Sequence, residues 1–257
     1  MKNCGEKLKR NSSGQLLIVA ALAIAILISS TTIYVYEVSR EKTATQDQLI
    51  AELVPAIKQS SRNAVISSLA NASKGGEKSV LDANLNSLSK AYRSLNQYGI
   101  CNLSFTVLND SNYADGIWLS WSDTSGFGVS SAYANFSLAV YGLTANITAN
   151  YAVNITTAVK LEGYYTIYGS EKSVSLICQV FNEGKPALAK NITLYYEDLG
   201  VWLPVNSSNN FSITDYGNGT YAISFTVIAI SDPVLVSAHV TDLREISVQA
   251  NATCYKA

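Results

Sequence analysis

Charged residues are scarce in this sequence. Asp, Glu, Lys and Arg make up 14% of its 257 residues, against roughly 25% in average soluble proteins. The formal net charge is -1, which gives no argument for a nucleic-acid partner. Ser, Thr, Asn and Tyr replace the missing charge, with 16 Tyr against 6 Phe. The composition therefore predicts a surface kept soluble by hydroxyls, amides and attached sugars.

Histidine is also nearly absent, because His239 is the only one. Its neighbours in the predicted strand are typical of core or half-buried positions, so we expect a structural role for this residue rather than that of a base or a metal ligand, which argues against a Ser-His-Asp triad and a His-ligated metal. Turn residues Asp110, Asn112, Asp115 and Asp123 would suit calcium, but the EF-hand pattern is missing and ordinary turn chemistry explains them. No phosphate-binding glycine loop is present. We predict no catalytic, cofactor or metal site, no small-molecule substrate, and a chain that is not an enzyme.

One long apolar run stands out against this polar background. Leu16 to Tyr36 contains no charged residue, Pro or Gly, and as a helix it would span about 31 Å, close to a bilayer core of roughly 30 Å. Four basic residues precede it within the first ten. The positive-inside rule then predicts a single-pass transmembrane helix over 15–37, with the N-terminus cytoplasmic and the bulk of the chain outside the cell membrane. A cleavable secretory signal usually has a shorter apolar region, of about 7–15 residues.

Asn-x-Ser/Thr sequons are three times as frequent as composition explains. The sequence has twelve sequons. A random chain of 257 residues with the same 21 Asn and the same 49 Ser and Thr would have about four. Asn11 would be cytoplasmic. In "NITANYAVNIT" the sequons alternate with apolar residues, which places them on the wet face of a strand. We therefore predict N-glycosylation at Asn71, Asn102, Asn109, Asn135, Asn146, Asn154, Asn191, Asn206, Asn210, Asn218 and Asn251.

Hydrophobic periodicity changes along the chain. It follows a helical stripe through Leu49, Leu53 and Ile57, breaks at "SKGGEKS", and resumes in a second amphipathic helix, so that 38–100 should hold extracellular amphipathic helices. From Cys101 the period is two. We expect an antiparallel β domain over 101–168 that a helix covers on one face. The predicted fold class is thus an α+β N-terminal part followed by an all-β immunoglobulin-like sandwich over 169–257.

Two stretches carry family resemblances. The residues "SLICQVFNEGKPALAKNITLYYED" and "GNGTYAISFTV" resemble the immunoglobulin-like domains of invasin- and intimin-type adhesins. A short basic segment, residues 1–14, ends at Gly14 and is followed by Gln15 and an apolar helix, and this arrangement resembles the cytoplasmic class III leader of archaeal type IV pilin-like proteins. This second resemblance implies cleavage between Gly14 and Gln15 and assembly of the retained helix in a filament. An uncleaved signal anchor with an unstructured cytoplasmic tail is the alternative.

The four cysteines divide between two compartments under this topology. Cys4 would stay in the reducing cytoplasm, whereas Cys101, Cys178 and Cys254 lie outside and allow three pairings with one thiol left over. Cys178 falls in mid-strand, where a free thiol behaves as a small buried hydrophobe. The sequence favours a disulfide between Cys101 and Cys254, which would tie the C-terminus to the first β block.

These observations predict a cell-surface structural or adhesive glycoprotein, pilin-like, anchored or assembled through its N-terminal helix. Its partners would be the membrane and copies of itself in a filament or a surface complex. A monomeric signal-anchored subunit of a surface or secretion complex is an alternative, with the amphipathic segment 43–72 pairing with a partner. An extracellular hydrolase that uses only carboxylates is a third reading, although the acidic residues are sparse and lie mainly in turns.

Overall fold

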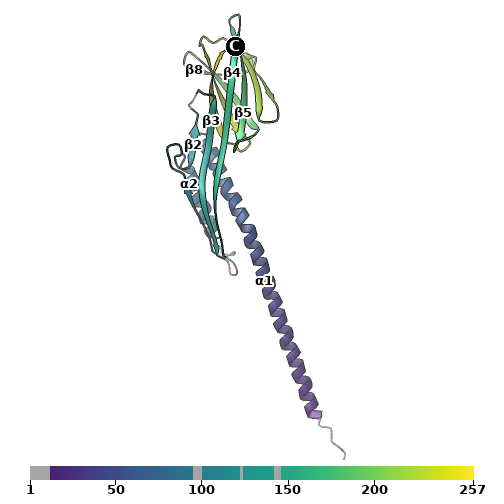
Figure 1. Ribbon diagram of the computed structural model, residues 1–257. Helices are drawn as coiled ribbons and strands as arrows, with labels where there is room; N and C mark the ends of the chain where they lie inside the picture. Colours follow the sequence, from purple (N-terminus) through teal and green to yellow (C-terminus); the bar gives the residue numbers. More distant parts are fainter. Residues whose placement is uncertain (1–11, 95–99, 122–123, 142–145) are drawn as a thin grey trace, which may run out of the picture. The chain divides into compact units, whose positions relative to one another are not determined.

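The computed structural model describes residues 12–94, 100–121, 124–141 and 146–257, and within α1 it describes side chains only at 27–38 and 52–72. The helices and strands follow in the order α1 Ser12–Ala72, α2 Val80–Arg93, β1 Ile100–Val107, β2 Ile117–Ser120, β3 Phe127–Tyr141, β4 Asn146–Tyr168, β5 Glu171–Asn182, β6 Lys185–Pro186, β7 Ala189–Asp198, β8 Val201–Pro204, η2 Ser207–Asn209, β9 Ser212–Asp215, β10 Thr220–Val227, β11 Val234–Asp242 and β12 Ser247–Lys256 (Figure 1). The chain divides into two units, Met1–Glu52 and Leu53–Ala257.

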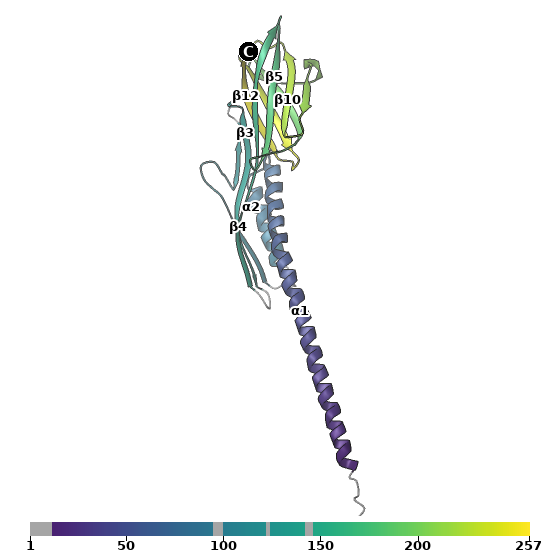
Figure 2. The same ribbon diagram turned by 45° about the vertical axis from the view of Figure 1, so that its right-hand side comes forward.

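The unit Leu53–Ala257 is built mostly from β-strands. The strands form one hydrogen-bonded network in the order β8-β7-β11-β12-β4-β5-β10-β9, with β3 beside β4 and with β1 and β2 beside β3. β4 is the shared element, because its residues 146–160 pair with β3 and its residues 157–168 pair with β5. Figures 1 and 2 show β3 and β4 running side by side away from the sandwich that the later strands complete.

This continuity corrects the predicted fold class. We expected an α+β part that ends before a separate sandwich begins at residue 169. The structure is instead predominantly β, and a single strand, β4, belongs to both regions. The period-two pattern locates strands correctly, but it does not reveal that one strand is long enough to exchange its partner halfway along.

The predicted membrane-spanning segment is also corrected. Residues 15–37 are part of α1, yet none of the helices in the described chain combines the length and the apolar character needed to cross a lipid bilayer. In this segment side chains are described only from Leu27 onward, and there four consecutive hydroxyl residues, 29–32, interrupt the apolar run. The single-pass cell-membrane location that we derived from the segment is therefore not supported.

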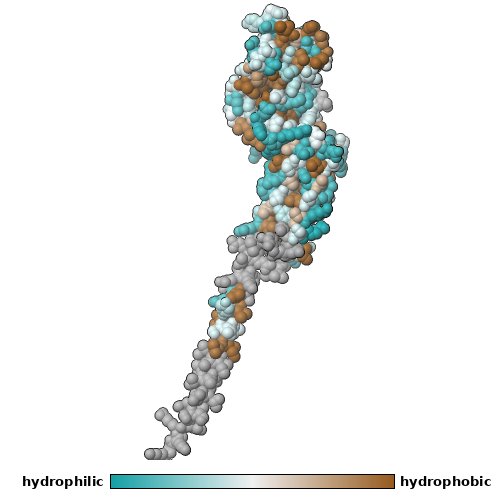
Figure 3. Space-filling view, turned by 180° about the vertical axis from the view of Figure 1, so that it is seen from behind, coloured by the Kyte–Doolittle hydropathy of each residue, from teal (hydrophilic) through white to brown (hydrophobic). Residues whose placement is uncertain are grey.

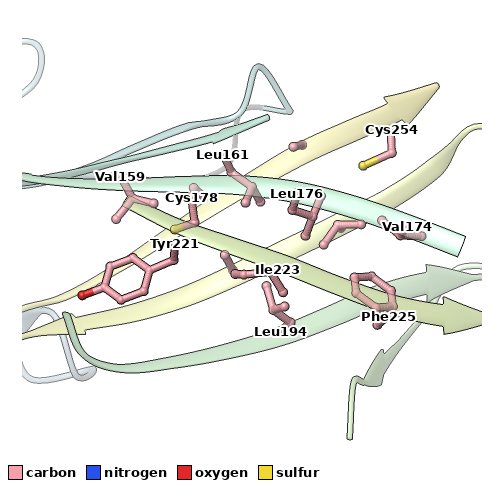
Figure 4. Packing of buried hydrophobic residues seen from close by; sticks show 14 of the residues in the cluster. Val159, Leu161, Val174, Leu176, Cys178, Leu194, Tyr221, Ile223, Phe225 and Cys254 are labelled. Carbon is pink, nitrogen blue, oxygen red and sulfur yellow. The ribbon is translucent and has the colours of Figure 1, made fainter. Parts of the chain in front are cut away.

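The sandwich core lies between two facing sheets. β4, β5 and β10 supply one side and β7, β11 and β12 the other (Figure 4). The predicted inward alternation is confirmed in β5 by Val174, Leu176, Cys178 and Val180, and in β10 by Tyr221, Ile223, Phe225 and Val227, all of which are buried. Burial of these side chains, worth roughly 1.5–3 kcal/mol for each large one, is the main force that holds the sheets together.

The inner face of β1, β3 and β4 packs against helices. Leu81 and Leu85 of α2 and Ile57, Val65 and Leu69 of α1 are buried at helical spacing. A polar contact joins α1 to β4, because the Ser61 hydroxyl lies 2.9 Å from that of Tyr151. The Tyr151 ring also stacks on the ring of Phe136 in β3, with 5.1 Å between the ring centroids. The expected cover of one sheet face by helix is thus observed. α1 continues through Pro55.

Gly126 joins three strands by close backbone contact. Its N–H donates to the carbonyl of Asn251 at 2.8 Å, and its carbonyl accepts from the N–H of Leu161 at 2.6 Å. Its φ is +85°, and a Cβ at this position would lie 2.1 Å from the Leu161 oxygen. Only glycine allows β4 and β12 to approach the start of β3 in this way.

We predict that Gly126→Ala destabilises the fold by more than about 3 kcal/mol, because left-handed strain of about 1–2 kcal/mol adds to a backbone clash. Gly184→Ala is the matched control. Gly184 also has a positive φ, of +75°, but nothing lies within 4 Å of its added Cβ, so it should show the strain alone. Urea unfolding of both variants measures the difference, and equal losses would contradict the close-contact role of Gly126.

Candidate functional site

Four predicted glycosylation sites share one sheet face. Asn102 on β1 is opposite Ala139, and Asn135 on β3 is opposite Ala152. Because side chains alternate along each strand, this register places Asn102, Asn135, Asn146 and Asn154 on the same outer face of β1, β3 and β4. All four are exposed. We call this surface the acceptor face.

The alternation that exposes these asparagines buries their neighbours. Leu103, Phe136 and Ile155 point to the opposite face and are buried. Each strand of this region therefore presents apolar residues to the helices and sequon residues to solvent. Packing of the buried residues fixes the strand register, and the register in turn fixes which residues form the acceptor face. A slip by one residue would exchange the two faces.

The amide nitrogens of the acceptor face have no hydrogen-bond acceptor among the described residues. Where these side chains make contacts, they accept through Oδ1: Asn102 from Arg93 at 3.2 Å and Asn135 from the Tyr133 hydroxyl at 3.0 Å. Asn154 likewise accepts, from Ser131 at 3.4 Å. N-glycosylation attaches the sugar to Nδ2. Within the described part of the chain, the reacting nitrogen of each side chain is therefore unengaged.

The remaining sequons lie outside the acceptor face. Six are exposed and lie in turns, at the end of α1 or on β7: Asn71, Asn109, Asn191, Asn206, Asn210 and Asn218. Asn251 differs, because it is only partly exposed and its Nδ2 donates to the Trp121 carbonyl at 2.8 Å. Its Oδ1 also accepts from Gln249 at 3.0 Å. Both ends of this amide are therefore held by the folded chain.

The leader prediction falls mostly beyond the described chain. Residues 1–11, which include Cys4 and Asn11, lie outside the described residues. Gly14 and Gln15 belong to the first turn of α1, but their side chains are not described. Cleavage between them stays a prediction.

The predicted disulfide is not formed. Cys101 lies on β1 opposite Val140, whereas Cys254 lies on β12 within the sandwich core, and both thiols are free and buried. The reason is that each side chain faces the core of its own strand pair. Cys178 is free and buried as well, and burial raises the pKa of Cys178 and of Cys254 to about 12. These thiols therefore stay protonated and act as small core residues.

A buried carboxylate joins the sandwich to β4. Asp242 is fully buried, and its Oδ1 accepts from the N–H groups of Arg244 and Ile246 at 2.8 and 3.0 Å. Its Oδ2 accepts from the Thr157 hydroxyl at 3.0 Å and from Nε of Arg244 at 2.9 Å. Four donors thus replace the water that the carboxylate loses on burial.

Arg244 extends this cluster to the helix. Its guanidinium donates to Glu183 at 2.6 Å and to the Thr156 carbonyl at 3.2 Å, and Glu183 also lies 3.7 Å from Arg62 of α1. We call Asp242, Arg244, Glu183 and Thr157 the polar junction. It ties together the β11–β12 turn, β4, the end of β5 and α1, so its acidic residues are engaged in structure.

Glu245 forms an exposed counterpart beside the junction. It pairs with Lys190 and, at 2.7 Å, with Lys74. Hydrogen bonds from Lys190 and then Lys74 lower the pKa of Glu245 to about 2. Because the folded-state pKa lies below the ordinary value of 4.5, the stabilisation from this group is complete above that pH and is lost as the pH falls toward 2.

The acidic turn considered for calcium performs turn chemistry. Asp110 accepts from the N–H groups of Asn112 and Tyr113, each at 2.8 Å, and these bonds, Tyr113 first, lower the pKa of Asp110. Asp123 lies outside the described residues. Within the described ranges, no three His, Cys, Asp or Glu side chains are grouped so that they could hold a metal ion.

One end of the sandwich exposes a set of apolar side chains, which Figure 3 shows as brown atoms at the upper end. Three of them lie in two neighbouring loops, 199–200 and 228–233, which are joined because Asp198 accepts from the N–H of Ile230 at 2.9 Å and the Ser231 hydroxyl accepts from the N–H of Leu199. The other three lie at the ends of β4 and β8. The members are Ile167, Tyr168, Leu199, Val201, Ile228 and Ile230, of which Tyr168 is 80% exposed and Ile230 74%. Clustered exposed apolar residues are typical of interaction surfaces.

Comparison of this chain with protein families, with curated proteins and with solved structures gave no match. The resemblances to pilin-like proteins and to adhesin domains therefore stay predictions. The candidate site rests on the geometry of the described residues alone.

We predict that Asp242→Asn lowers the free energy of unfolding by about 2–3 kcal/mol, because an amide NH2 group would replace a carboxylate oxygen that accepts two buried hydrogen bonds, although Glu183 remains as a carboxylate partner of Arg244. Glu245→Gln, which removes an exposed carboxylate from the adjoining turn, is the control and should have a much smaller effect. Urea unfolding near neutral pH compares the two. A loss for Asp242→Asn no larger than that for Glu245→Gln would show that the junction does not hold the sheets together.

We also predict that Asn251 stays unglycosylated while Asn135 and Asn154 carry glycans, since only Asn251 has its amide nitrogen bonded within the fold. Glycopeptide mass spectrometry of protein from its own cells measures occupancy site by site. Occupancy at Asn251 equal to that on the acceptor face would contradict the hydrogen-bond argument.

Proposed function

We propose that this chain is a non-catalytic structural or adhesive glycoprotein of the cell surface. The observation that carries the proposal is the acceptor face, on which Asn102, Asn135, Asn146 and Asn154 lie together with amide nitrogens that donate to none of the described residues. Glycans on this face would cover the outer side of β1, β3 and β4 while the helices cover the inner side. Such a sheet would be protected against proteases and against edge-to-edge association.

Two further features support a structural rather than a catalytic role. The carboxylates of the polar junction are bonded to an arginine and to hydroxyl and N–H donors, which leaves them unsuited to acid–base work. The exposed apolar loops at the end of the sandwich offer a contact surface for an adhesive function. The sandwich would thus act as a spacer or a binding head.

Protease treatment of intact cells tests the proposal. If the chain is displayed at the surface, trypsin should release peptides from it, and the peptide 94–160, which contains both Asn135 and Asn154, should carry glycan mass. A cytoplasmic protein of similar abundance is the control for lysis. Absence of glycan on every sequon peptide, or recovery of the chain only after lysis, would overturn the proposal.

A further inference from the structure

A hollow of about 370 Å³ lies on the outer face of the sheet formed by β7, β8, β11 and β12. Tyr195, Trp202, Ser237, His239 and Gln249 line it. Strand register brings them together: Tyr195 is opposite Ser237, and His239 is opposite Gln249. Trp202 comes from the edge strand β8. The hollow is therefore built by four strands and belongs to neither the acceptor face nor the exposed apolar loops.

Ser237 has an unusual environment. It alternates with the core residues Val236 and Ala238, so it points to the outer face, yet only 2% of its surface is exposed. The larger side chains around it place it at the bottom of the hollow. Its hydroxyl is buried and has no hydrogen-bond partner within the described chain. Since nearly all buried hydroxyls are bonded, this oxygen points to a ligand that supplies the missing polar group.

Aromatic rings form the walls of the hollow. Trp202 is 45% exposed, and the Tyr195 and His239 rings lie 4.9 Å apart at an angle of 46°. An indole face that stays open to solvent is a suitable platform for a flat, weakly apolar group. His239, for which we expected a structural role among core neighbours, lies on this outer face instead.

The polar groups of the hollow are uncharged. Partial desolvation lowers the pKa of His239, so at neutral pH its imidazole offers one donor and one acceptor nitrogen. The Gln249 amide donates to Asn251, which leaves its carbonyl oxygen as an acceptor. None of the lining side chains carries a charge, so the site does not favour an ionic ligand.

We propose that this hollow binds the pyranose ring of a neutral sugar. One C–H face of the ring would lie on Trp202, and its hydroxyls would bond to Ser237, His239 and Gln249, which together provide donors and acceptors. The proposal rests on the adhesive form of the proposed function and names its ligand class. Binding by the hollow and glycan occupancy of the sequons are measured separately, so failure of one is distinguishable from failure of the other.

The test uses the full chain made without glycans, so that its own sugars do not compete. Methyl α-D-mannopyranoside, methyl β-D-glucopyranoside and N-acetylglucosamine are titrated while NMR follows the side-chain amide signal of Gln249. At least one should give a saturable shift with a Kd of about 1–10 mM. Glucuronic acid, which carries a charge, should bind more weakly than glucose.

The variants separate a binding role from a structural one. Ser237→Ala should weaken binding at least about tenfold while the melting temperature stays the same or rises, because an unpartnered buried hydroxyl is removed. Trp202→Ala should weaken binding similarly. Tyr216→Ala, which removes an exposed aromatic ring at the end of β9, is the control and should bind normally.

Two results would overturn the proposal: no saturable shift with any of the three sugars up to about 50 mM, or binding that is unchanged in both Ser237→Ala and Trp202→Ala. The source of the sugar is tested with glycosylated protein, because Asn191 lies on the same outer face of β7. If the glycosylated wild type does not bind added sugar but the glycosylated Asn191→Gln variant does, the hollow holds the chain's own glycan. If both forms bind, the ligand is external.

Discussion

The hydrogen-bond ladder of β4 is the constraint on which the rest of the structure depends. This strand of 23 residues pairs with β3 along its first part and with β5 along its second, and its residues 164 and 165 pair with β12. A single register therefore fixes both the acceptor face and one wall of the sandwich core. The two regions are not independent domains, because a shift in one would move side chains in the other.

The polar junction secures this shared strand at the point where its partner changes. Thr157 belongs to both pairings of β4, and its hydroxyl donates to the buried Asp242. Arg244 neutralises that carboxylate and reaches Glu183, which in turn approaches α1. Burial of a charge is unfavourable unless every lone pair has a donor, so this arrangement tolerates few alternatives.

The two surfaces proposed for sugar attachment and for sugar binding both lie on outer faces of strands. The acceptor face presents amide nitrogens to solvent, whereas the hollow around Ser237 collects aromatic rings and uncharged polar groups on a different sheet. Both use the same property of a β-strand, which buries one side and leaves the other free to vary. The two surfaces suit different chemistry, the first the attachment of sugar and the second its recognition.

The sequence was enough to predict the strands, the inward residues of β5 and β10, and the exposure of most sequons, because each of these follows from local alternation. It did not determine that β4 is shared, that Cys101 and Cys254 face separate cores, or that Asn251 is bonded to Trp121. It also placed a membrane-spanning helix where none is found in the described chain. Only the tertiary structure decided these points, since register and the pairing of distant strands depend on contacts between residues far apart in the chain. The hollow around Ser237 was invisible for the same reason: its five lining residues come from four strands, and no local pattern connects them.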